Sequence, residues 1–371
     1  QWREAIALAQ RMVQRAKMQR LDRLQASWES MLGLAYYSLP TGDRAANLQQ
    51  VIACYEAALR VYTEAESPTD WAATQNNLGN AYGDLPTGDR AANLQQAIAC
   101  YQAALRVYTE ADFPTDWATT RNNLAVTYSN LPTGDRTANL QQAIACYEAA
   151  LRVYTETDFP TDWAMTQNNL GTAYGDLPTG DRSANLRQAI ACLQAALRIY
   201  TEADFPVNWA AAQHNLGLAY QELPTGDRAA NLQKAIACYQ AALRVRTEFD
   251  FPTQWAMTQN NLGNAYRKLP TGDRATNLQQ AITCFEAALR VRREADFPMQ
   301  WALTTFNVAL LCQDEALPGD RCGNLLRAQS LLQDCLRVFT PEGFPHDYEN
   351  VQVELLSVAE AMREANCPDA P

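Results

Sequence analysis

The chain has 371 residues, of which 47% are hydrophobic and 19% charged, and its formal net charge is −11. This composition supports a packed core, and the acidic balance argues against nucleic acid or an anionic membrane as the main partner, because phosphate binding requires clustered Lys and Arg. No stretch approaches the ~20 consecutive apolar residues of a membrane span, and the N-terminus lacks the apolar segment of a signal peptide. We therefore expect a cytoplasmic protein.

A six-residue motif and a tryptophan recur along the chain with the same spacing. The motif Leu-Pro-Thr-Gly-Asp-Arg occurs six times, starting at Leu39, Leu85, Leu131, Leu177, Leu223 and Leu269, and a shortened copy starts at Leu317. Successive full copies start 46 residues apart, and the same interval separates Trp71, Trp117, Trp163, Trp209, Trp255 and Trp301. A fixed period in this range is typical of one structural unit stacked many times. We therefore predict one continuous domain over residues 1–371.

The predicted elements follow this period along the whole chain. Residues 1–20 match the second helix of a unit without its partner, since Ala5-Ile6-Ala7 lies 46 residues before Val51-Ile52-Ala53. The chain thus begins in mid-pattern, and we expect it to be a piece of a longer polypeptide, with an uncovered N-terminal face available for self-association. Residues 21–340 are expected to form seven helix pairs, and residues 341–371 a degenerate, more polar capping helix and tail. About sixteen antiparallel helices result.

The unit from residue 114 to residue 159 illustrates why each repeat is expected to contain two helices. Pro114 suits the first turn of a helix, and Trp117 begins an apolar stripe at helical spacing. Pro132 ends this helix, and Asp135 is a favourable N-cap for the next one. The second helix is apolar over a wide arc, so it must be covered by both its partner helix and the next unit.

The spacing of small and aromatic residues in each unit resembles that of a known repeat family. The pattern is Leu78-Gly79-x-x-Tyr82, Ala97-x-x-x-Tyr101, Ala104 and Pro114. It resembles the tetratricopeptide repeat, although Trp71 lies four residues earlier than in that family and the period is 46 rather than about 34. Long arrays of kinesin light chains and of bacterial multidomain signalling proteins are similar in style. HEAT-type repeats share the period but lack the Leu-Gly, Tyr and Ala spacing.

The resemblance implies an all-α, right-handed α-solenoid of about seven to eight helix-turn-helix repeats. It also implies that the first helix of each unit lines the concave surface and that the array binds proteins. We therefore expect a protein-interaction scaffold or sensor module in signalling. The alternatives are a structural or oligomerising arm, and the non-catalytic part of a larger effector whose caspase-like protease or NTPase domain lies outside this segment.

Three other sets of repeated side chains are interpreted as structural. The tryptophans are expected to belong to the core between repeats rather than to form aromatic binding platforms. In the Gly-Asp-Arg tripeptides, Asp is expected to cap a helix or to link neighbouring loops together with Arg, rather than Arg binding an anion. The third set is expected to lie on an exposed face and to pair with nearby Glu: Arg60, Arg106, Arg152, Arg198, Arg244, Arg290 and Arg337.

Neither the cysteines nor the histidines suggest catalysis. Six of the ten cysteines occupy one repeated position (Cys54, Cys100, Cys146, Cys192, Cys238 and Cys284). Equivalent helices lie at least ~8–10 Å apart, too far for a disulfide, so we expect free, buried thiols. Cys312 and Cys322 have no catalytic context, and His214 and His346 lie in no nucleophile or metal motif. We predict a protein that is not an enzyme and has no cofactor and no metal.

A pair of asparagines recurs in the middle of each first helix, where Asn is a poor helix former. In tetratricopeptide arrays, an Asn before the Leu-Gly pair commonly holds the backbone of a bound peptide. By resemblance this role falls to Asn77, Asn123, Asn169, Asn215, Asn261 and Asn307, with their neighbours Asn76, Asn122, Asn168, His214 and Asn260. Without clustered lysines, the partner is expected to be an internal segment, neutral or mildly basic. The alternative is that these amides join neighbouring helices.

Overall fold

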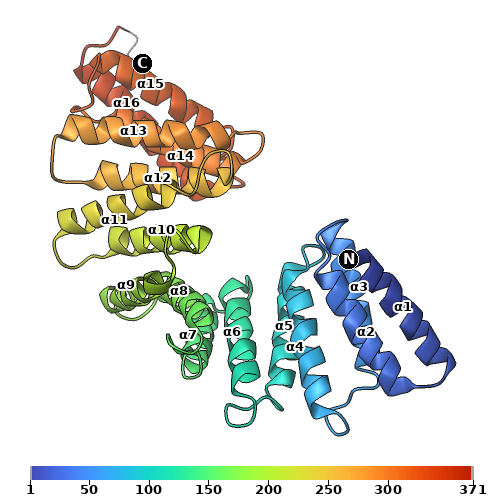
Figure 1. The fold of residues 1–371 in the computed structure, drawn as a ribbon. Helices are drawn as coiled ribbons and strands as arrows, with labels where there is room; N and C mark the ends of the chain where they lie inside the picture. Colours follow the sequence, from blue (N-terminus) through green and yellow to red (C-terminus); the bar gives the residue numbers. More distant parts are fainter. Residues whose placement is uncertain (1, 369–371) are drawn as a thin grey trace. The chain divides into compact units, whose positions relative to one another are not determined.

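The computed structural model describes residues 2–368, and this part folds into sixteen α-helices and no strands (Figure 1). The helix bounds are α1 (Trp2–Met18), α2 (Asp22–Tyr37), α3 (Arg44–Ala58), α4 (Pro68–Asp84), α5 (Arg90–Ala104), α6 (Pro114–Asn130), α7 (Arg136–Ala150), α8 (Pro160–Asp176), α9 (Arg182–Ile199), α10 (Pro206–Glu222), α11 (Arg228–Leu243), α12 (Pro252–Lys268), α13 (Arg274–Val291), α14 (Pro298–Cys312), α15 (Arg321–Cys335) and α16 (Pro345–Glu364). The prediction of an all-α repeat fold is confirmed. None of these helices is long and apolar enough to cross a membrane.

The helices alternate between two types with different start signals. First-type helices are the even-numbered ones, and those from α4 onward begin with proline at the first turn, where its missing N–H costs no hydrogen bond. Second-type helices are the odd-numbered ones, and those from α3 onward begin directly after an aspartate. In α7, the Asp135 side chain accepts a hydrogen bond of 2.8 Å from the backbone N–H of Thr137. The predicted capping role of the repeated Asp is confirmed.

The repeated loop is built to turn sharply between the two helices. Gly134 has φ of 80° and Gly226 has φ of 82°, a conformation that glycine adopts without the strain other residues would meet. One side chain closes each loop: the amide nitrogen of Asn139 donates to the carbonyl of Thr133 at 2.9 Å, and Asn231 makes the same bond to Thr225. This geometry explains why the Gly and the Asn keep the same positions in every copy of the loop.

The chain divides into two compact units, Gln1–Gly180 and Asp181–Pro371. The first contains α1 to α8 and the second α9 to α16. Within each unit, every first-type helix except the last one (α8 and α16) packs between two second-type helices. The cores are built from large side chains of second-type helices, such as Leu140 and Tyr147 in the first unit and Leu232 and Tyr239 in the second.

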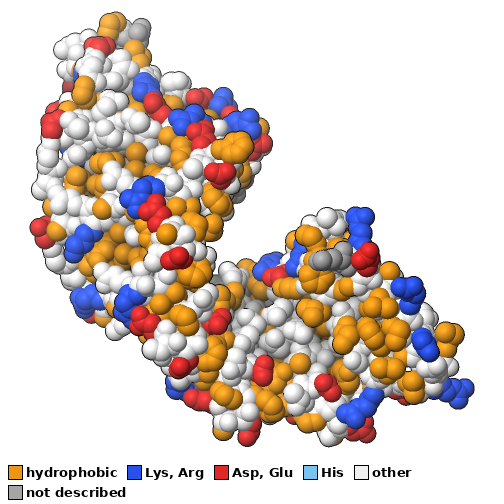
Figure 2. Space-filling model, viewed as in Figure 1, with side chains coloured by type: hydrophobic (Ala, Val, Ile, Leu, Met, Phe, Trp, Pro, Cys, Tyr) orange, Lys and Arg blue, Asp and Glu red, His pale blue; other side chains and the backbone are white. Residues whose placement is uncertain are grey.

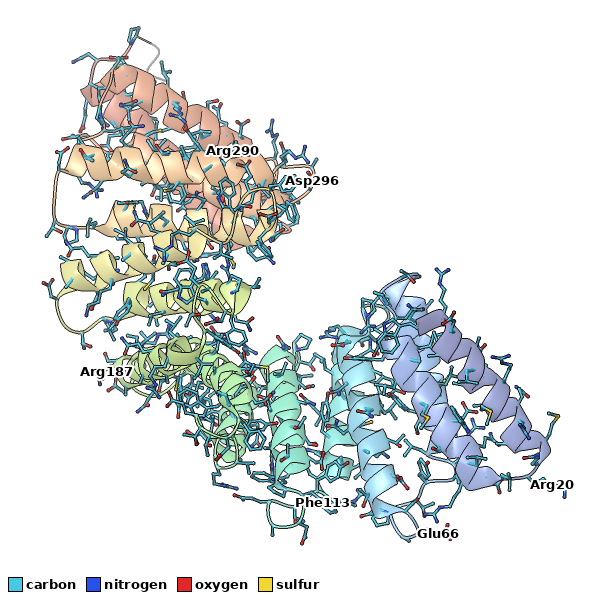
Figure 3. The ribbon with its side chains drawn as sticks, viewed as in Figure 1. Arg20, Glu66, Phe113, Arg187, Arg290 and Asp296 are labelled. Carbon is cyan, nitrogen blue, oxygen red and sulfur yellow. A yellow bond between two sulfur atoms is a disulfide. The ribbon has the colours of Figure 1, made fainter. Side chains whose placement is uncertain are left out.

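Five of the six repeated tryptophans belong to these cores, as predicted, and the sixth, Trp301, is partly buried. Trp71, Trp117, Trp209 and Trp255 are each at most 8% exposed. An arginine from the end of the following second-type helix covers each ring, and that arginine also pairs with a glutamate. The ion pairs of this exposed stripe are Arg106–Glu64, Arg152–Glu110, Arg244–Glu202, Arg290–Glu248 and Arg337–Glu294 (Arg290 is labelled in Figure 3). For these five, the predicted pairing with nearby Glu is confirmed.

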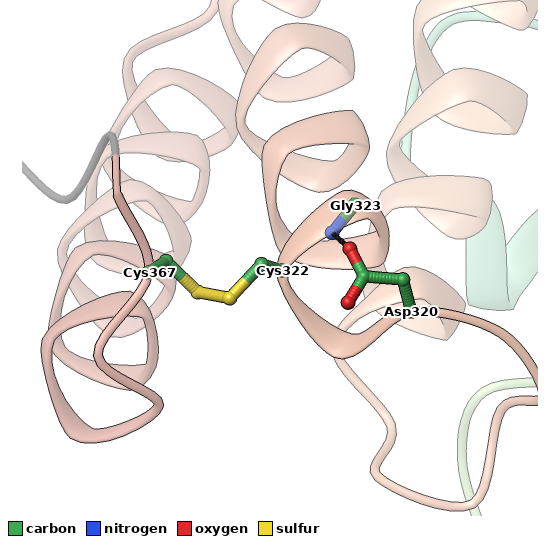
Figure 4. The surroundings of a disulfide bond; sticks show 4 residues. All are labelled: Asp320, Cys322, Gly323 and Cys367. Carbon is green, nitrogen blue, oxygen red and sulfur yellow. Dashed lines mark hydrogen bonds between the residues drawn. A yellow bond between two sulfur atoms is a disulfide. The ribbon is translucent and has the colours of Figure 1, made fainter.

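One disulfide was not expected from the sequence. Cys322, near the start of α15, is bonded to Cys367, which follows α16, and their Cα atoms are 5.5 Å apart (Figure 4). The sequence argument considered only the repeated cysteine position, where equivalent helices are too far apart to be bridged. Within that repeated position, burial raises the pKa of the Cys54 and Cys284 thiols to about 12, so these groups stay protonated.

Candidate binding face of the first-type helices

The repeated asparagine pair forms two rows on the first-type helices. We call the first residue of each pair the inner row: Asn76, Asn122, Asn168, His214 and Asn260, followed by Phe306. We call the second residue the outer row: Asn77, Asn123, Asn169, Asn215, Asn261 and Asn307. All of the outer-row side chains are half-buried, whereas Asn122 and His214 of the inner row are fully buried. The two rows are therefore in different environments.

The inner row is used by the fold in each unit. In the first unit, Thr120 donates to the amide oxygen of Asn76 at 3.1 Å and Thr166 donates to that of Asn122 at 3.2 Å. In the second unit, Thr304 donates to Asn260 at 3.2 Å. Each of these bonds joins one first-type helix to the next, so the inner-row amides connect neighbouring repeats.

His214 takes the place of the inner-row Asn in α10. Its Nδ1 atom is 3.0 Å from the hydroxyl of Thr258, and its ring lies against Tyr239 with centroids 5.5 Å apart. Burial, together with the nearby positive charge of Arg246, lowers the pKa of His214 from 6.5 to about 3. The imidazole is therefore neutral at pH 7, and it links α10 to α12 much as the inner-row amides link other repeats.

Replacing His214 with Asn, the residue of the sister repeats, should reduce the loss of stability in acid. Because the pKa in the folded state lies below 6.5, the unfolded chain binds the proton more readily. The contribution of the neutral ring is complete above pH 6.5 and is lost as the pH falls toward 3, by about 2 kcal/mol at pH 5. Urea unfolding at pH 7.5 and pH 5 measures it, and an equal drop in both proteins would contradict the assignment.

Some outer-row amides keep hydrogen-bonding groups that the described part of the folded chain does not pair. The side chains of Asn77 and Asn307 make no hydrogen bond within the described residues. Asn123 donates one N–H to the amide oxygen of Asn80 at 3.1 Å, and its own amide oxygen accepts no hydrogen bond there. An amide with a spare donor and a spare acceptor can bind both groups of a peptide unit.

The positions next to the outer row vary between repeats. The slot three residues after each outer-row Asn contains Asn80, Val126, Thr172, Leu218, Asn264 and Leu310. Four residues further along, the slot contains Asp84, Asn130, Asp176, Glu222, Lys268 and Asp314. Several of these carboxylates bind an arginine of the Gly-Asp-Arg loop one repeat earlier, as in the 3.5 Å pair of Arg136 and Asp176. These arginines thus link neighbouring repeats, but their partner is a carboxylate at the end of the next first-type helix and not, as the sequence had suggested, the Asp of a loop.

The described residues contain no group of three or more His, Cys, Asp or Glu side chains arranged to hold a metal ion. The features that distinguish this face are amides, a few charges and differing apolar side chains. This arrangement offers hydrogen bonds and shape to a ligand.

No protein-family model and none of the curated proteins match the chain. Among solved structures, the APC/C hetero-tetramer Cut9-Hcn1 matches at 16% identity and a TM-score of 0.50, over 91% of this chain and 62% of that chain. The C-terminal part of a TPR repeat-containing protein from Cytophaga hutchinsonii matches at 11% identity and a TM-score of 0.49, over 84% of this chain and 95% of that one. BtubC (BKLC) from P. vanneervenii matches at 23% identity and a TM-score of 0.46, over 66% and 91% of the two chains.

At these identities the likeness concerns the fold alone. The alternating helix types, the Leu-Gly pairs packed on a tyrosine or phenylalanine, and the similarity to helical-repeat structures agree with one another. A Cβ atom added at Gly79 would lie 2.7 Å from the ring of Tyr101, and one added at Gly217 would lie 2.7 Å from the ring of Tyr239. The glycine of the Leu-Gly pair therefore marks a close contact between two helices. The chain has the all-α fold of tetratricopeptide-like helix pairs.

Proposed function

We propose that the chain is a scaffold or sensor module that binds an extended protein segment along its first-type helices. The observation that supports this most directly comes from three outer-row amides: the half-buried side chains of Asn77 and Asn307 make no hydrogen bond within the described residues, and the amide oxygen of Asn123 accepts none there. A peptide backbone offers both donors and acceptors, which amides of this kind can bind. The proposed activity is binding rather than catalysis.

Specificity in this proposal comes from the variable slots. Amides bind the peptide backbone, which is the same in every sequence. Selection between peptide sequences therefore requires side chains that differ between repeats, such as Val126, Thr172 and Leu218. The chain carries 41 acidic and 30 basic residues. A segment that is neutral or mildly basic over most of its length is favoured by this balance.

The test compares the two rows in the first unit. Asn77→Ala should weaken binding by about 0.5–1.5 kcal/mol for each hydrogen bond lost, with little change in thermal stability, because this side chain makes no hydrogen bond within the described residues. The matched control, Asn76→Ala, breaks the bond that Asn76 accepts from Thr120 of the next first-type helix and should lower the melting temperature. The probe is a positional-scanning library of N-acetylated, C-amidated decapeptides, with affinities measured by fluorescence anisotropy.

Two results would contradict the proposal. One is that no peptide pool binds the unsubstituted protein. The other is that the outer-row variant melts early while its peptide binding is unchanged, because the amides would then be structural. Circular dichroism of each variant separates these results from simple misfolding.

A structural or oligomerising arm is the second candidate, and one observation favours it. Large apolar side chains are exposed along α1 and α2, where Figure 2 shows apolar side chains gathered: Trp2, Leu8, Met18, Leu24, Met31 and Leu34. Exposed apolar clusters of this kind mark interaction surfaces. Sedimentation velocity of the unliganded protein, run beside the peptide assay, reveals association through this face. Association without any peptide binding would favour the arm.

A further inference from the structure

The arginines of the Gly-Asp-Arg loops form a regular series of ion pairs. Each paired arginine binds a carboxylate that comes 40 residues later, at the end of the next first-type helix. The pairs are Arg44–Asp84 and Arg136–Asp176 in the first unit, and Arg182–Glu222 and Arg274–Asp314 in the second. An arginine in this series is thus positioned to hold a carboxylate.

Arg90 departs from the series, as does Arg228 of the second unit, where Lys268 stands 40 positions later. The residue 40 positions after Arg90 is Asn130, whose neutral amide donates to the carbonyl of Val126 at 2.8 Å. One guanidinium nitrogen of Arg90 donates to the carbonyl of Gly83 at 2.5 Å. The equivalent arginines Arg228 and Arg274 donate to the carbonyls of Gln221 and Arg267 in the same way. Within the described residues, no carboxylate binds the rest of the Arg90 guanidinium.

A cavity of about 380 Å³ lies beside Arg90 in the first unit. Its lining includes Asn80, Gly83 and Asp84 of α4 and Asn123 and Asn130 of α6. Gly83 leaves the space open because it has no side chain. In the second unit, the equivalent Gln221 is buried and accepts a hydrogen bond from Tyr239, so a side chain fills the corresponding place.

The charges on the cavity wall leave one cation unmatched. The carboxylate of Asp84 accepts a hydrogen bond of 2.5 Å from the Tyr37 hydroxyl and lies 3.6 Å from Arg44. Burial first, and then this bond, raises the pKa of Tyr37 to about 12, so its hydroxyl keeps the proton that it donates. Asp84 is therefore already paired, and the charge of Arg90 is the one without a counterpart.

The cavity also contains an amide donor. The amide oxygen of Asn80 accepts hydrogen bonds from Tyr101 at 2.7 Å and from the outer-row Asn123 at 3.1 Å. Its amide nitrogen makes no hydrogen bond within the part of the chain that the structure describes. The cavity thus combines a guanidinium and an N–H donor with a member of the outer row.

We propose that this cavity binds the carboxylate of an Asp or Glu side chain on the protein segment held by the outer row. The inference rests on the proposed function and specifies one position of its ligand. The ligand would supply the anion that Asp or Glu residues of the chain itself supply to the four paired arginines of the series. Guanidinium and carboxylate groups fit one another through paired, charge-assisted hydrogen bonds. A segment that is otherwise neutral or mildly basic would carry one acidic residue here.

The test supplies the missing carboxylate from the protein. Asn130→Asp keeps every other cavity side chain and completes the pair that the sister repeats make. Screened with the same capped decapeptide library, in which carboxylates come only from side chains, the unsubstituted protein should select Asp or Glu at one position. The variant should bind the selected acidic peptide about tenfold more weakly and should bind its Gln counterpart unchanged.

Two further variants complete the experiment. Arg90→Gln removes the guanidinium and should abolish the acidic preference. Gln141→Glu, on an exposed position of α7, adds the same charge as Asn130→Asp away from the cavity and should leave affinity within about twofold. Peptide binding without any acidic preference, or a preference that persists in Asn130→Asp and Arg90→Gln, would overturn the cavity proposal while leaving the proposed function intact. Absence of all peptide binding would overturn both.

Discussion

Replacing Trp117 with alanine should destabilise the first unit by about 3–5 kcal/mol, the range seen when a large aromatic side chain is removed from a core. Trp117 is 6% exposed at the start of α6, and the guanidinium of Arg152 lies 5.1 Å from its ring. The substitution would leave a cavity between repeats and would also remove the surface on which Arg152 rests. Urea unfolding followed by circular dichroism measures the loss, and hydrogen exchange locates it.

Arg152→Met is the matched control for this prediction. It keeps an apolar side chain near the ring but removes the cation and its 2.6 Å ion pair with Glu110. Both partners of that pair are more than two-fifths exposed, and exposed pairs contribute about 0–1 kcal/mol. Arg152→Met should therefore cost much less than Trp117→Ala. Equal costs would mean that Trp117 is a surface platform rather than part of the core.

Breaking the bond between Cys322 and Cys367 should destabilise the C-terminal end of the second unit by about 4 kcal/mol in a chain-entropy estimate. The two residues are 45 positions apart, so the bond restricts a long loop of the unfolded chain and holds the end of α16 against α15. Hydrogen exchange of α16, measured with and without dithiothreitol, should show faster exchange after reduction.

The control is the double variant Cys322→Ala with Cys367→Ala. Its exchange should already be fast and should not respond to dithiothreitol. Thiol titration of the unfolded protein gives an independent check, because the sequence contains ten cysteines and the bond removes two of them from reaction. Reaction of all ten before reduction would show that the bond is absent.

The same titration bears on where the protein resides. Disulfides persist in oxidising compartments and are rare in cytosolic proteins. The bond between Cys322 and Cys367 and the prediction of a cytoplasmic protein therefore point in opposite directions. The cytoplasmic location stays a prediction, and the redox state of these two residues in the producing cell would test it.

The sequence alone determined the helices and much of the core. A proline at the start of each first-type helix from α4 onward and an aspartate before each second-type helix from α3 onward are local signals, and their 46-residue recurrence made each repeat support the others. Trp117 and its equivalents could be assigned to the core because they lie on an apolar helical stripe. Local signals of this kind do not depend on which repeat packs against which.

Only the tertiary structure distinguished the two members of each asparagine pair. Asn76 and Asn77 are adjacent, but only Asn76 points toward the next first-type helix, where Thr120 meets it 44 residues later. Such a contact depends on the rotation of one helix against its neighbour, which the sequence pattern does not specify. The Cys322–Cys367 bond arises in the same way, from the packing of the last, degenerate repeat.

The unmatched charge of Arg90 lies between these two cases. Asn130 is visible in the sequence where four of the other repeats have Asp or Glu, so the difference could have been read there. Its meaning required the structure, because only the observed pairs showed that an arginine of one loop binds a residue 40 positions later. Repetition makes the sequence informative about what all repeats share. The proposed binding site depends on how one repeat differs from the others and on which side chains the packing brings together.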